Sequence, residues 1–158
     1  MACANRLLLL LGAIAVVAVA AGCGSSSRHG GSACGANQYA VDLSSNGATG
    51  GIVGSVRITR VHVSSCRLAI TVRLAIRRGA ELVDSVKGNP ATARVDRQLG
   101  PAPFAESWVW RNWCSHGTGF ALVASVGSAT ARADVPTTPR CDEPKAPSTL
   151  DALAGQAP

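Results

Sequence analysis

Residue types that bind metals or react as nucleophiles meet in one short stretch of this sequence. Cys114 and His116 lie two positions apart, directly after Trp113. Structural zinc sites combine about four cysteine and histidine ligands, and their cysteines typically occur as Cys-x-x-Cys pairs. The sequence has no Cys-x-x-Cys, and its other histidines, His29 and His62, are isolated. We therefore predict no metal site and no cofactor.

The same stretch holds all three tryptophans of a chain that is only 4% aromatic. Trp108 and Trp110 are two residues apart, so they share one face of a strand, and Trp113 lies on the other face. Exposed aromatic rings beside hydrogen-bonding groups suit sugar binding. The candidate binding residues are therefore Trp113, Asn112, His116 and Arg111. The alternative, which we favour for Trp108 and Trp110, is a place in the core beside a disulfide of Cys114.

The residue patterns that catalysis would need are missing. There is no Gly-x-Ser-x-Gly and no Ser-x-x-Lys. The nine acidic residues are spread singly, apart from Asp142-Glu143, whereas a carboxylate pair must converge on one cleft. No Gly-rich loop stands between a strand and a helix, as phosphate binding would require. We predict a protein that is not an enzyme and has no catalytic residue.

The positive charge of the chain is dispersed. Fifteen basic and nine acidic residues give a net charge of +6, and the only adjacent pair of basic residues is Arg77-Arg78. Nucleic-acid and membrane-surface tracts cluster several basic residues together. We therefore predict a solvated sheet face and no nucleic-acid partner. A weak attraction to anionic lipid or envelope polymer is the expected consequence of the net charge.

The N-terminus has the layout of an export signal. Arg6 precedes an apolar run over residues 7–21, which is shorter than the roughly 20 residues that span a bilayer. The run ends in Ala20-Ala21-Gly22-Cys23, which resembles the lipobox of bacterial lipoproteins. The resemblance implies that residues 1–22 are a signal peptide, that Cys23 carries lipid, and that the protein sits on the extracytoplasmic face of the cell membrane. Residues 23–33 are rich in Gly and Ser and predict a flexible tether.

Four cysteines remain for the mature domain, and an even number in an oxidising compartment predicts two disulfides. Three pairings are possible, and spacing alone does not choose among them. We expect Cys34–Cys66 and Cys114–Cys141, because each pair would join a strand end to a neighbouring segment. Each disulfide would close a loop of about 30 residues, which is worth about 3 kcal/mol in the chain-entropy model.

Strands are predicted from an alternation of period two. The inward positions of the clearest strand are Leu68, Ile70, Val72, Leu74 and Ile76. The preceding run, 52–63, also alternates, and its phase changes near Arg60 as a β-bulge would make it. His62 then lies within a strand. Further short strands are expected over 39–43, 81–86, 92–99, 107–113, 120–126 and 130–135.

Seven or eight short strands separated by Gly, Pro and Asn predict an all-β, antiparallel, immunoglobulin-like sandwich. The domain is expected to span residues 34–141. Residues 142–158 are expected to form a Pro-rich tail that is extended or disordered.

Several short pieces of the chain together resemble one family. They are Gly51 with Cys66-Arg67-Leu68, Gly88-Asn89-Pro90, Trp110-Arg111-Asn112-Trp113-Cys114 and Pro139-Arg140-Cys141-Asp142. In these the chain resembles actinobacterial lipoproteins with the domain of unknown function DUF4232, over roughly residues 34–150. The resemblance implies an exported, disulfide-linked, immunoglobulin-like sandwich, and it carries over no site residue.

A small rigid domain held at a membrane suits recognition by its loops. We expect a monomeric, non-catalytic binding module for an envelope protein or glycan. The loop 114–119 and the turn 88–90 are the expected contact points. The alternative is a structural or assembly accessory of an envelope complex.

Overall fold

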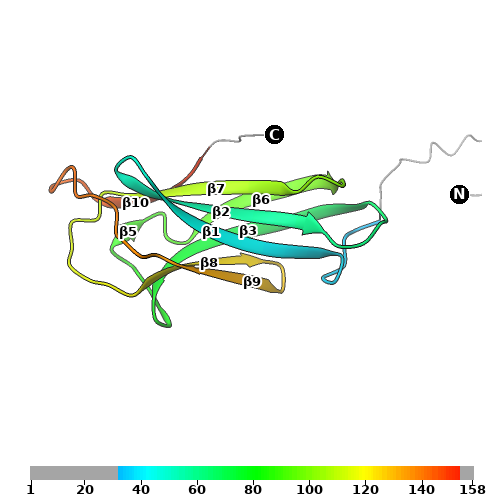
Figure 1. The fold of residues 1–158 in the computed structure, drawn as a ribbon, viewed down its shortest axis with the longest axis horizontal. Coiled ribbons are helices and arrows are strands. Elements are labelled where there is room, and N and C mark those ends of the chain that lie inside the picture. Colours follow the sequence, from blue (N-terminus) through cyan, green and yellow to red (C-terminus); the bar gives the residue numbers. More distant parts are fainter. Residues whose placement is uncertain (1–31, 154–158) are drawn as a thin grey trace, which may run out of the picture.

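The computed structural model describes residues 32–153, which form ten strands in two facing sheets and no helix (Figure 1). The predicted signal peptide, Cys23 and nearly all of the predicted tether lie outside the described residues. Residues 32–153 contain no helix long and apolar enough to cross a membrane. The all-β prediction is confirmed for this part of the chain.

The first sheet has five strands in the spatial order β1-β2-β7-β10-β5. Their bounds are β1 Tyr39–Ala48, β2 Gly51–Arg60, β7 Phe104–Arg111, β10 Ser148–Ala152 and β5 Val86–Lys87. The neighbours are antiparallel except for β10 and β5, which run parallel.

The second sheet is built around one long strand. Its bounds are β4 Glu81–Leu82, β3 Cys66–Arg78, β8 Phe120–Val126, β9 Ala129–Asp134 and β6 Ala91–Leu99. β8 pairs with the last seven residues of β3, and β6 pairs with the first nine, so the two lie on opposite edges of β3. β9 follows β8 at the outer edge.

The alternation of buried and exposed side chains that was predicted for this strand is observed along β3. Leu68, Val72, Leu74 and Ile76 are buried against the first sheet, whereas Arg67 and Arg73 are exposed on the outer face. A strand with apolar and charged residues in alternation can bury one face only by packing on a second sheet. The dispersed arginines of this strand are therefore the solvated face of a sandwich.

The two sheets approach each other closely where a glycine replaces a side chain. Gly54 on β2 pairs with Trp108 on β7 and faces the other sheet. A Cβ at position 54 would lie 2.7 Å from Cδ1 of Leu122 and 3.0 Å from Cδ2 of Leu74. The absence of a side chain at position 54 therefore leaves room for Leu74 and Leu122 of the second sheet.

The two disulfides lie at opposite ends of the sandwich. Figure 1 shows the first described residues at one end of the long axis, beside the start of β3, and the loops 112–119 and 136–147 at the other end. Cys34–Cys66 belongs to the first end and Cys114–Cys141 to the second, so both predicted pairings are confirmed. We call the end that holds Ser32 and Cys66 the proximal end, and the end that holds Cys114 and Cys141 the distal end.

The sandwich extends further than predicted. The segment 142–158, predicted to be a Pro-rich tail, contributes β10 to the first sheet, between β7 and β5, so the predicted domain 34–141 stops short. Nε1 of Trp110 donates a hydrogen bond to Oγ of Ser148 at 2.9 Å, and Leu150 is buried with 2% exposure. These contacts come from the partner strands, so the local sequence around the prolines does not reveal them.

Two other strand predictions were wrong. β2 ends at Arg60, and Val61 and Val63 are 53% and 97% exposed in the following loop, so the phase change marks the end of a strand and not a bulge. His62 therefore lies in a loop. The predicted strand 81–86 is two short strands, β4 and β5, which belong to different sheets, and they help to raise the count from seven or eight to ten.

Candidate functional site

The distal half of the core is an aromatic cluster. Trp110, Trp113 and Phe120 meet edge to face, with ring centroids 5.1 to 5.4 Å apart. Edge-to-face contacts of this kind add stability beyond the area that the rings bury. Trp110 and Phe120 come from facing sheets, and Trp113 closes the cluster from the loop after β7.

Trp113 is buried, with 6% exposure, and the prediction that it is exposed was wrong. β7 ends at Arg111, and Asn112 has a backbone φ of 54°. A left-handed residue turns the chain, so strand alternation no longer applies to the residue after it. The three tryptophans therefore offer no exposed ring on which a sugar could stack, and the alternative of a core position holds for Trp108 and Trp110.

Asn112 fastens one distal loop to another. Its Nδ2 donates to the carbonyl oxygens of Glu143 and Ala146, each at 2.9 Å. Its Oδ1 accepts hydrogen bonds from the backbone N–H of Asp142 at 3.1 Å and of Glu143 at 2.9 Å. An asparagine amide has two donor hydrogens and two acceptor lone pairs, and all four are used here. Asn112 is thus a positioning residue for the loop and has no free group for a ligand.

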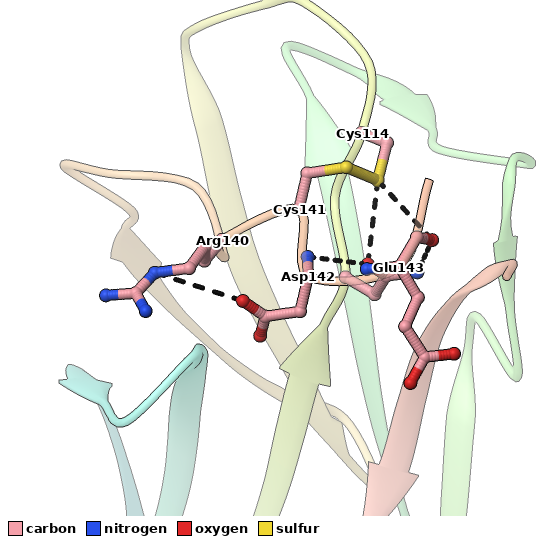
Figure 2. A network of polar contacts seen from close by, with 6 residues as sticks. Cys114, Arg140, Cys141, Asp142 and Glu143 are labelled. Carbon is pink, nitrogen blue, oxygen red and sulfur yellow. Dashed lines mark hydrogen bonds and ion pairs between the residues drawn. A yellow bond between two sulfur atoms is a disulfide. The ribbon is translucent and has the colours of Figure 1, made fainter. Parts of the chain in front are cut away.

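The second disulfide is exposed beside this network (Figure 2). Sγ of Cys114 lies 3.5 Å from Oδ1 of Asn112 and 3.8 Å from the carbonyl oxygen of Glu143. A disulfide sulfur carries no hydrogen, so these are packing contacts. Nε of Arg140 lies 3.9 Å from Oδ1 of Asp142, and both side chains are well exposed. The cystine and the asparagine together hold residues 141–146 against the end of β7.

Two clefts open at the distal end, and they divide the four predicted binding residues between them. The Arg78 cleft, about 250 Å³, is lined among others by Arg78, Glu81, Ser85, Trp113, Ser115 and His116. The Arg111 cleft, about 260 Å³, is lined among others by Gly50, Arg111, Asn112, Asp142, Glu143 and Thr149. The sequence placed the four predicted residues in one site, but the turn at Asn112 separates them.

Arg78 was not predicted to be a binding residue. Its guanidinium nevertheless has contacts on two sides within its cleft. Its guanidinium carbon lies 4.6 Å from the centroid of the Phe120 ring, and its Nη2 donates to the carbonyl oxygen of His116 at 3.5 Å. Gly117 lies directly over it: a Cβ there would be 2.2 Å from Nη2. The sequence signal for Arg78 was the doublet Arg77-Arg78 at the end of an alternating run. Adjacent strand residues point to opposite faces, so only one of these two arginines can lie on the outer face.

The predicted contact turn at residues 88–90 has an internal role. Oδ1 of Asn89 accepts from the backbone N–H of Ile76 at 2.9 Å. Its Nδ2 donates to the carbonyl oxygens of Ile76 and Val83, each at 3.0 Å. Asn89 therefore bridges β3 and the segment after β4 through internal hydrogen bonds.

The carboxyl groups with shifted pKa values lie in the proximal half. Burial raises the pKa of the Glu106 carboxyl on β7, and the positive charge of Arg97 acts in the opposite direction. The hydrogen bond from Arg67 lowers the pKa of the Asp96 carboxyl on β6.

The clefts offer recognition chemistry without a nucleophile and base in contact. In the Arg78 cleft, no hydrogen bond joins His116 to Ser85 or Ser115 within residues 32–153. A serine nucleophile needs a base within hydrogen-bond reach. Across the same residues, no three His, Cys, Asp or Glu side chains gather as metal ligands would.

Comparison with known proteins adds no assignment: no family model, no curated protein and no solved structure matches the chain. The resemblance to the DUF4232 lipoproteins stays a prediction.

Proposed function

We propose that the protein is an exported, lipid-anchored protein of the cell envelope and acts as a non-catalytic binding module for an envelope component. The observation that carries the proposal is the separation of the two ends. The chain enters the domain at the proximal end (Figure 1). The residues that line both clefts belong to strand ends and loops of the distal end.

Anchoring at residue 23 would use this separation. Cys23 stands nine residues before Ser32, which lies at the proximal end beside Arg67. Lipid on that cysteine would hold the proximal end near the membrane and turn the distal end away from it. Loops that extend from a rigid scaffold are common binding elements, and here they would face the envelope.

The cysteine chemistry agrees with an extracytoplasmic location. All four cysteines within residues 32–153 form disulfides. Disulfides persist in exported proteins and are rare where thiols are kept reduced. The proposal of a non-catalytic role is supported by the clefts, which combine charged side chains of both signs with hydroxyl groups and, among the described residues, hold no serine hydrogen-bonded to a histidine.

Export and anchoring can be tested on the full-length protein in an actinobacterial host fed an alkyne analogue of palmitate. We expect the label in the membrane fraction, blocked thiols at all four domain cysteines, and loss of the label in Cys23→Ala. Recovery of an unlabelled, reduced protein from the cytosol would refute the proposed location.

Recognition by the distal end can be tested by crosslinking in intact cells followed by purification. The double variant Arg111→Ala/His116→Ala should capture several-fold less envelope material than the wild type. The matched control is Val63→Ala, which changes a 97% exposed side chain at the proximal end and should leave capture unchanged. If one stable protein partner is captured equally by all variants, the protein is a structural accessory of an envelope complex instead.

A further inference from the structure

We propose that the Arg78 cleft binds the carboxylate of an acidic sugar, such as a uronic acid unit of an envelope glycan. This inference rests on the proposed function as a binding module and names the ligand class of one of its sites. Four observations support it. The guanidinium of Arg78 is oriented by its neighbours and forms no ion pair among the described residues, polar groups surround it, and the cleft has the size of one sugar unit.

Arg78 is held in place before any ligand arrives. It is the last residue of β3 and pairs in register with Phe120 on β8, whose ring lies beneath its guanidinium at 4.6 Å. The loop passes over the guanidinium at Gly117, where a Cβ would lie 2.2 Å from Nη2 and the guanidinium would have to shift to make room. A guanidinium that is already ordered loses little conformational freedom when it binds, so more of the interaction energy appears as affinity.

The charge of Arg78 is available to a ligand. The ion pairs within residues 32–153 involve Arg67, Arg132 and Arg140. Arg78 pairs in register with Glu81 across the β3–β4 turn, yet their side chains form no ion pair in this part of the chain. One of its five N–H donors reaches the His116 carbonyl, and the planar fork of arginine matches a carboxylate in a bidentate fashion.

The other groups that line the cleft suit the hydroxyls of a sugar. Ser85 and Ser115 can donate and accept hydrogen bonds, the imidazole of His116 can do both, and the Glu81 carboxylate accepts. Trp113 forms part of the wall.

Size and charge favour this ligand and this cleft. A volume of about 250 Å³ lies below the roughly 300 Å³ at which pockets for drug-sized molecules begin, so the cleft fits one sugar unit. A peptide would need an exposed strand edge or a larger apolar groove. A carboxylate is opposed by two acidic side chains in the Arg111 cleft, Asp142 and Glu143, and by only one in the Arg78 cleft, Glu81.

The test is a titration of the full-length protein in detergent with sodium glucuronate, followed by tryptophan fluorescence because Trp113 lines the cleft. The methyl ester of glucuronic acid is the neutral match. We expect glucuronate to change the fluorescence and to bind at least about tenfold more tightly than the ester, as a charge-assisted bidentate contact would give.

Two variants and one control locate the effect. Arg78→Gln removes the charge, and Gly117→Ala displaces the guanidinium while keeping the charge, so both should weaken glucuronate binding at least about tenfold. Arg73→Gln removes an arginine from the outer face of the same strand and should bind as the wild type does. Circular dichroism should show that all three variants are folded. If Gly117→Ala does not fold, the binding measured for Arg78→Gln decides the test.

Equal binding of the acid and its ester, or unchanged binding by Arg78→Gln, would overturn the inference. So would the absence of glucuronate binding in a protein that is folded and oxidised. The proposed function is judged separately, by the lipid label and by capture in cells. A protein that is anchored and captures envelope material but ignores glucuronate keeps the proposed function and loses only this ligand class.

Discussion

The proximal and distal ends each contain one disulfide, yet they are built in different ways. The two cystines close loops of similar length, with sequence separations of 32 and 27 residues. Cys66 is completely buried in the core, whereas Cys114 and Cys141 are both exposed. Similar spacing in the sequence therefore gives one cystine with a half that is buried in the hydrophobic core and one that joins surface loops.

The hydrogen bonds at the two ends differ in the same sense. At the proximal end, backbone bonds continue the sheet: Cys34 N donates to the Arg67 carbonyl at 3.0 Å, and Arg67 N donates to the Ser32 carbonyl at 2.9 Å. At the distal end, the side chain of Asn112 holds the loop. The proximal end is thus an extension of the fold. The distal loops are attached to the fold at a few points.

The strongest test of this contrast removes each disulfide in turn. The pair Cys34→Ala/Cys66→Ala should lower the free energy of unfolding by more than about 3 kcal/mol, because loop entropy and core packing are both lost. The pair Cys114→Ala/Cys141→Ala should cost about 3 kcal/mol or less, since no core contact is lost with it. Urea unfolding measures both, and a larger loss in the distal pair would contradict the contrast.

Asn112 allows the distal attachment to be removed without touching the core. Asn112→Gly keeps the left-handed backbone but loses four hydrogen bonds, and we expect a loss of about 2 kcal/mol in the free energy of unfolding. Asn112→Ala should cost about 1 kcal/mol more, because alanine is strained at a φ of 54°.

Thermal or urea unfolding is the measurement for both variants. The exposed Asn46→Ala on β1 serves as the control and should change little. If the glycine variant were as stable as the wild type, the loop would be held by the disulfide alone.

Glu106 tests the proximal half through pH. It shares a sheet face with the buried Val56, and burial raises the pKa of its carboxyl in the folded state. The folded chain then retains this proton to higher pH than the unfolded chain. The stability that Glu106 contributes is therefore present below the unfolded pKa of about 4.3 and is lost as pH rises through the folded value.

Glu106→Gln should remove that pH dependence. Relative to the variant, the wild type should lose less than about 1 kcal/mol between pH 4 and pH 7, because the carboxyl is only partly screened from water. Melting temperatures of both proteins over this range provide the measurement. A wild type that gains stability over the variant as pH rises would show that Arg97 outweighs burial.

The smallest effect is expected from the exposed ion pair between Arg67 and Asp96, which lies on the outer face near the proximal disulfide. The hydrogen bond from Arg67 lowers the pKa of Asp96, so any stability it gives is present above the unfolded pKa and is lost as pH falls through the folded value. Asp96→Asn should therefore be slightly less stable than the wild type at pH 7 and equal to it at pH 2. Melting at low and high salt checks this, since an exposed pair is screened by salt.

The parts of the fold that follow from local pattern were predictable. The alternation from Leu68 to Ile76 identifies β3 because an exposed face and a buried face impose a period of two on the sequence. The two cystines were predicted by placing Cys66 and Cys114 at strand ends. Both inferences need only the neighbouring residues and the geometry of a strand.

The parts that depend on a change of direction were not predictable. The alternation of side chains along a strand placed Trp113 on the exposed face. The left-handed backbone of Asn112 turns the chain, and Trp113 lies in the core instead. Nothing near Leu150 reveals that its partners are β7 and β5, which lie far away in the sequence. Arg78 became part of the candidate site only because Phe120 and Gly117 enclose it, and that arrangement requires the fold.

The place of β10 has a consequence for how the chain can mature. It is the last of the described strands, yet it separates β7 from β5 inside the first sheet, so β5 has no partner until residues 148–152 have been made. A ribosome or a secretion channel delivers the chain from its N-terminus, and domains complete folding as units. The late insertion of this strand would therefore keep the sheet open during synthesis, and would close it only once residues 148–152 have emerged.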